Sequence, residues 1–136
     1  MDMKDVSWLQ TRYLDFLAQR QDSLQEDMVH FYEQECVDEA NFEKIKFNVV
    51  EIFAKMFKLS LDDDPDALKV KYLGFFEKIT QPWHLNRKKA IEFEKEVERI
   101  IEDVKIKEAD LLKTCFEEYC FSPGYLTMSF SKYMTI

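Results

Sequence analysis

The sequence predicts an all-α protein: a single up-and-down bundle of four or five helices, followed by an extended C-terminal tail. With two Gly and three Pro in 136 residues, the chain lacks the turn residues that a many-stranded sheet needs. Hydrophobic residues make up 46% of the chain and recur in steps of three and four, which is helical spacing. We therefore expect one helical domain over residues 1–121 and a tail over 122–136, without an internal repeat or linker.

The first helix is predicted over residues 7–36. Two capping-box patterns, Ser7 with Gln10 and Ser23 with Glu26, each mark a helix start, so two shorter helices are the alternative. The apolar stripe stays in phase across Ser23, which favours one continuous helix with at most a kink. Its members are Leu9, Tyr13, Phe16, Leu17, Leu24, Met28 and Phe31.

A second, more deeply buried helix is predicted from Phe42 to Leu59, where the apolar stripe is widest. The third helix should begin at Asp64 and Pro65, because an acid at the cap and Pro in the first turn are strong start signals. We expect it to end at Thr80, since Pro82 follows closely and Pro disfavours helical geometry in the residue before it.

The last helix is predicted over residues 84–121. At 1.5 Å per residue it would run to roughly 55 Å, longer than its neighbours could cover. A break near Lys105 to Lys107 is therefore expected.

The tail alternates with period two after Pro123 and Gly124, which suit a type II turn. Leu126, Met128 and Phe130 share one face of this strand-like segment. An isolated strand leaves backbone groups unpaired, so three arrangements stay open. The tail could lie in a groove of its own bundle, pair with the same tail in a homodimer, or add to another protein's sheet.

The net charge of −8 is concentrated in residues 1–40, which hold ten acids and three bases. Such a surface repels phosphates and attracts basic proteins, so we expect a basic protein partner and no nucleic acid. No apolar run approaches the roughly 20 residues that span a bilayer, so no membrane partner is expected. Three cysteines form no paired framework, which favours a cytoplasmic location and a packing role for the thiols.

Candidate metal ligands gather on the first helix, where Glu26, Asp27, His30 and Glu33 lie three or four residues apart. Di-metal carboxylate bundles need a Glu three residues before a His on each of two helices. Asp27 takes that place before His30, and the second histidine, His84, has no acid there. The apolar stripe also points away from most of these carboxylates. We therefore expect a solvated polar face without a metal or another cofactor.

No catalytic constellation is apparent, since neither histidine is tied by sequence to a nucleophile and no glycine-rich phosphate loop occurs. The working hypothesis is a non-enzymatic bundle that acts by macromolecular contact, as a regulator, adaptor or immunity-type factor. The alternative is a metal-binding or small-molecule-binding bundle with enzymatic activity, which would use the four candidate ligands. For contact with a partner, the candidate residues are Asp22, Glu26, Asp27, Glu33, Leu126, Met128 and Phe130.

Overall fold

The computed structural model describes residues 6–121, which form four α-helices arranged as two antiparallel hairpins. In the first hairpin α1 (Val6–Glu33) pairs with α2 (Val37–Leu59), and in the second α3 (Pro65–Glu92) pairs with α4 (Glu96–Phe121). The predicted all-α bundle is confirmed, and α1 is one continuous helix. The predicted strand-like tail, residues 122–136, lies outside the described residues.

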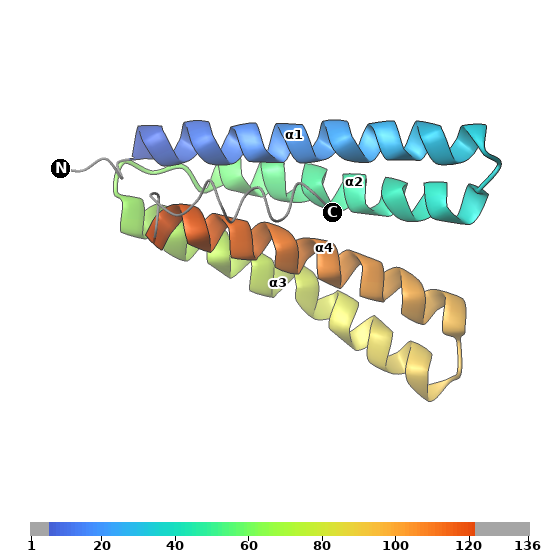
Figure 1. Cartoon of the computed structure of the whole chain (residues 1–136). Helices are drawn as coiled ribbons and strands as arrows, with labels where there is room; N and C mark the ends of the chain where they lie inside the picture. The colour runs from blue at the N-terminus through green and yellow to red at the C-terminus, as the bar shows by residue number, and fades with distance from the viewer. Residues whose placement is uncertain (1–5, 122–136) are drawn as a thin grey trace.

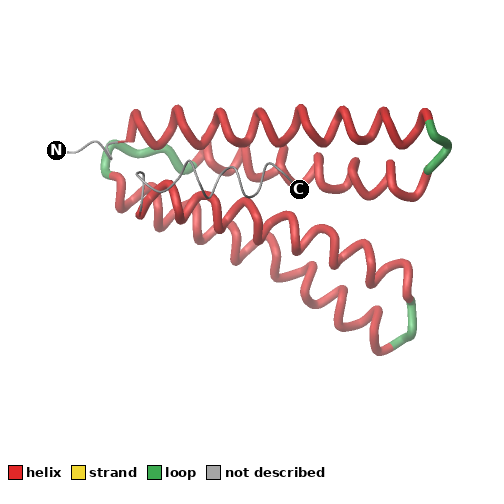
Figure 2. Tube along the Cα trace, in the orientation of Figure 1, coloured by secondary structure: helices red, strands yellow, loops and turns green. Residues whose placement is uncertain are grey.

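The two hairpins meet at one end and diverge toward the other (Figure 1). The inner helices α2 and α4 make the main contact between them. The shared core lies at the closed end, where α1 and α3 begin, and its large buried side chains are Tyr13, Phe16, Phe53, Phe57, Tyr72, Phe76, Leu112 and Phe116. Each hairpin therefore has a free outer end, and Figure 2 shows the short turn that closes it.

The same turn closes both hairpins. After α1, Glu35 adopts a left-handed conformation (φ 62°), and Cys36 N–H donates to the Phe31 carbonyl while Glu35 N–H donates to that of Tyr32. After α3, Glu94 (φ 54°) takes the corresponding place. The two hydrogen bonds recur there, since Lys95 N–H donates to the Ala90 carbonyl and Glu94 N–H donates to the Ile91 carbonyl. These are Schellman motifs in which Glu stands at the position that Gly usually occupies.

Several predicted boundaries are wrong. The second helix begins at Val37 instead of Phe42, and the last helix begins at Glu96 instead of residue 84. The third helix does not end at Thr80 but runs through Pro82 to Glu92, and α4 has no break at Lys105 to Lys107. The break lies instead at the α3–α4 turn. It carries neither Gly nor Pro, so it gave no sequence signal of a helix end.

Tertiary contacts hold α3 together beyond Pro82. Trp83 packs against the core with the Lys105 ammonium 5.5 Å from its ring centroid, and Arg87 forms an ion pair with Asp103 of α4. Pro82 itself is exposed, so the carbonyl four residues earlier, which loses its helical N–H partner, lies where water can replace it. These contacts outweigh the local preference against an internal Pro.

The two hairpins are copies of one unit, although no repeat was predicted from the sequence. α1 and α3 are both 28 residues long, and each boundary of α3 lies 59 residues after that of α1, from 6 to 65 and from 33 to 92. The same offset aligns LQTRYLDF (9–16) with LKVKYLGF (68–75). It also aligns the ion pair of Glu43 and Lys46 with that of Glu102 and Lys105.

Contacts across the core repeat with the same offset, as they would about a two-fold axis. The ring centroids of Tyr13 and Phe116 are 5.2 Å apart, and the equivalent pair, Tyr72 and Phe57, is also 5.2 Å apart. Within each hairpin, Tyr13 lies 4.9 Å from Phe57 and Tyr72 lies 4.7 Å from Phe116. In an interface between identical surfaces, residue i contacts j of the partner while j contacts i, and this core shows that pattern within one chain.

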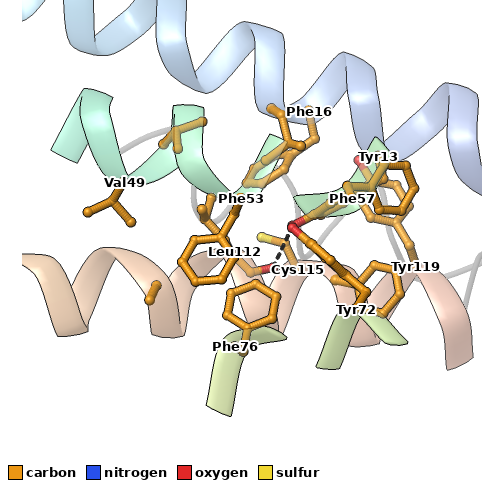
Figure 3. Close-up of a cluster of buried hydrophobic side chains, with 14 of the residues drawn as sticks. Tyr13, Phe16, Val49, Phe53, Phe57, Tyr72, Phe76, Leu112, Cys115 and Tyr119 are labelled. Carbon is orange, nitrogen blue, oxygen red and sulfur yellow. Dashed lines mark hydrogen bonds between the residues drawn. The ribbon is translucent and has the colours of Figure 1, made fainter. Parts of the chain in front are cut away.

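Tyr13 and Tyr72 meet on the pseudo-two-fold axis, and Figure 3 shows them inside the aromatic cluster. Their hydroxyl oxygens lie 2.6 Å apart, and the Tyr13 hydroxyl also donates to the Leu112 carbonyl at 3.3 Å. When both bonds form, Tyr72 is the donor to Tyr13. Burial raises the pKa of both hydroxyls, so they stay protonated and neutral.

Because the bonds form a chain with Tyr13 in the middle, the two hydroxyls should differ in energetic importance. Tyr13→Phe leaves the Tyr72 hydroxyl buried without its partner and should lower the free energy of unfolding by about 1–3 kcal/mol. Tyr72→Phe leaves Tyr13 bonded to the Leu112 carbonyl and should cost about 1 kcal/mol or less. Urea unfolding followed by circular dichroism measures both, and a Tyr72→Phe cost equal to that of Tyr13→Phe would contradict the assigned direction.

Candidate functional site

The outer end of the first hairpin, residues 21–43, is called here the acidic tip. It holds eight acidic residues and no Lys or Arg. Seven of the acids are exposed, and within residues 6–121 none of these seven forms an ion pair: Asp22, Glu26, Asp27, Glu33, Glu35, Asp38 and Glu39. Their charges therefore project into solvent from both helices and the turn.

Exposed apolar side chains lie among these acids. Val29 is 45% exposed, Tyr32 47% and Val37 53%. Val29 falls on the same stripe of α1 as Asp22, Glu26 and Glu33, because these positions follow one another in steps of three or four. The acidic tip thus combines uncompensated negative charge with accessible apolar contact area.

The sequence identified part of this surface. Asp22, Glu26, Asp27 and Glu33 all lie exposed on α1. Asp22, Glu26 and Glu33 lie opposite the apolar stripe, whereas Asp27 borders it, because it is three residues from Leu24 and four from Phe31. Glu35, Asp38 and Glu39 were missed because the first helix was predicted to run to residue 36 and the second to start at Phe42. In the structure α1 ends at Glu33 and α2 begins at Val37. The remaining contact candidates, Leu126, Met128 and Phe130, lie outside the described residues.

The equivalent end of the second hairpin, residues 80–102, is called here the second tip. It has five basic and five acidic residues, so its net charge is zero. Four of these charges are compensated by ion pairs. Arg99 contacts both Glu96 and Asp103, Arg87 also contacts Asp103, and Glu102 contacts Lys105. The two tips therefore have the same backbone conformation, but their net charges differ by eight.

The candidate metal ligands do not assemble into a centre. Glu26, Asp27, His30 and Glu33 are all exposed on α1. Among residues 6–121, no group of three His, Cys, Asp or Glu side chains is arranged to hold a metal ion.

A groove of about 700 Å³ runs along the second hairpin between α3 and α4. Gly74 lies in it, and a Cβ atom built there would meet nothing within 4 Å. In the first hairpin the equivalent residue is Asp15. His84, Glu77, Asp110, Lys113 and Glu117 also line the groove.

The cysteines differ in environment. Cys115 is buried and Cys120 packs against the core, which confirms the packing role expected for them. Burial raises the pKa of the Cys115 thiol to about 12 and that of Cys120 to about 11. The packing role is wrong for Cys36, which lies in the α1–α2 turn and is partly exposed.

No family model, curated protein or solved structure matches the chain. Among the described residues, no helix combines the length and apolar character needed to cross a bilayer.

The thiol environments predict a clear order of alkylation. Because the thiolate is the reactive form, iodoacetamide at mildly alkaline pH should modify Cys36 at least about 100-fold faster than Cys115. Peptide mass spectrometry over time gives the two rates, and denaturation in concentrated urea should bring them together. Equal rates in the folded protein would show that Cys115 is accessible and would contradict the described packing.

Proposed function

We propose that this protein is a non-enzymatic binding protein whose acidic tip docks onto a basic surface of another protein. The observation that carries the proposal is the charge difference between two equivalent tips. Residues 21–43 carry eight acids without a base, whereas residues 80–102 have no net charge. A regulator, an adaptor or an immunity-type factor would act in this way.

The second tip serves as an internal control for the demands of the fold. It has the same Schellman turn, with Glu94 in place of Glu35, and the same ion pair between a buried Glu and a half-buried Lys on its inner helix. A hairpin of this kind therefore folds without excess negative charge. Like charges crowded on one end repel one another and destabilise a compact state, so their presence on the first tip favours a role in binding.

The composition of the acidic tip suits recognition of a basic protein. Negative charge accelerates encounter with a positive surface and selects against acidic partners. Val29, Tyr32 and Val37 provide apolar area that a partner could cover, and tyrosine is enriched among residues that dominate binding energy. The negative charge would thus govern the association rate, and the apolar residues would govern the lifetime of the complex.

Equivalent glutamates in the two tips allow a matched test. Glu33, Glu35 and Glu39 correspond to Glu92, Glu94 and Glu98 with the 59-residue offset, and all six are exposed. The triple variant E33Q/E35Q/E39Q should lose capture of the partner from an extract of the native host, while E92Q/E94Q/E98Q should retain it. For a purified partner, the first variant should slow association roughly tenfold or more.

Salt provides an independent readout, because screening weakens attraction between exposed charges. Association with the wild-type protein should slow as salt rises, and the E33Q/E35Q/E39Q variant should show a shallower dependence. Equal capture by the two triple variants, or the absence of any salt-sensitive partner, would contradict the proposal.

A further inference from the structure

One contact between the hairpins breaks the internal symmetry. Arg20 of α1 donates from Nε and Nη2 to the two carboxylate oxygens of Glu108 on α4, both at 2.8 Å. The Glu108 side chain is 3% exposed and that of Arg20 is 19% exposed. This bidentate ion pair lies beside the aromatic core, where an unpaired charge would be strongly unfavourable.

The symmetry-related positions are apolar. The 59-residue offset places Ile79 of α3 at the position of Arg20, and Val49 of α2 at the position of Glu108. Val49 belongs to the buried core cluster, and Ile79 packs against that cluster. One side of the repeat therefore uses an ion pair where the other side uses two hydrocarbon side chains.

We infer that each hairpin presents a surface complementary to a second copy of the same hairpin, and that Arg20 and Glu108 make the first hairpin select the second. The repeated aromatic contacts supply the self-complementary part of this surface. A second copy of the chain offers the same surfaces, so the charges decide which hairpins pair. This inference is independent of the acidic tip.

Pairing of like hairpins would misplace both charges. Two first hairpins would bury each Arg20 against Val49 of the other copy, and two second hairpins would bury each Glu108 against Ile79. Only the pairing of a first hairpin with a second one satisfies both ionic groups, because a buried charge needs an opposite partner. The ion pair thus disfavours an assembly of two chains in which first hairpin pairs with first hairpin and second with second. In that assembly, residues 60–64 of each chain would connect the two four-helix bundles.

Two double substitutions remove this selection by opposite chemistry. R20I/E108V copies the apolar contact onto the ionic side, and V49E/I79R copies the ionic contact onto the apolar side. In both variants, like and unlike hairpins become equally compatible. Light scattering over a concentration series should therefore show that each variant assembles in pairs of chains more readily than the wild type does. The protein concentration at the midpoint of this association should be at least tenfold lower than for the wild type.

A third variant is the matched control. V49R/I79E places arginines on the first hairpin and glutamates on the second, so that the native pairing gains an ion pair and like pairing gains repulsion. Its mass should follow that of the wild type at every concentration. Circular dichroism reports whether each variant is folded.

The outcomes separate selection from a purely stabilising role. If R20I/E108V is folded and its mass follows that of the wild type, the inference is overturned, whatever V49E/I79R does. Failure of R20I/E108V to fold also overturns it, because the two sides would then not be equivalent. Association by V49R/I79E as strong as that of the other two variants would overturn it as well.

Discussion

The closed end of the bundle depends on the contact between Tyr13 and Tyr72 across the pseudo-two-fold axis. Two hydroxyls are buried there among aromatic rings, and they are tolerated because each is hydrogen-bonded. That requirement fixes the register between the hairpins, since a shift of α1 against α3 would separate the two hydroxyls and leave that of Tyr72 buried without its partner. The packing of Phe57 and Phe116 on the same axis, and with it the direction in which each hairpin leaves the core, follows from this register.

Local signals allowed much of the fold to be predicted. The apolar stripe of α1 and the cap at Asp64 and Pro65 act within a few residues, and the structure confirms both, including the hydrogen bond from Asp66 N–H to the Asp64 side chain. Pro82 misled the prediction because its local cost is outweighed by contacts with α4. Glu35 and Glu94 were not recognised as turn residues because glutamate rarely adopts a left-handed conformation.

The candidate site was predictable to the same extent. The exposure of Asp22, Glu26 and Glu33 followed from their place opposite the apolar stripe. Extending the surface to α2 required knowing where the turn lies. The repeat escaped notice because few side chains are shared outside LQTRYLDF and LKVKYLGF, and buried positions can exchange one apolar residue for another without changing the fold.

The divergence of the hairpins has a mechanical consequence. Each turn lies about 20 Å beyond the shared core, judging from the roughly 14 residues of α2 between Val50 and the turn. Each arm is stiffened by its paired helices but joined to its neighbour mainly at the base. A change of about 10° in the angle between the arms would move one tip by roughly 4 Å over that length. With this geometry, slight repacking around the tyrosines would be enlarged into a displacement of the charged surface.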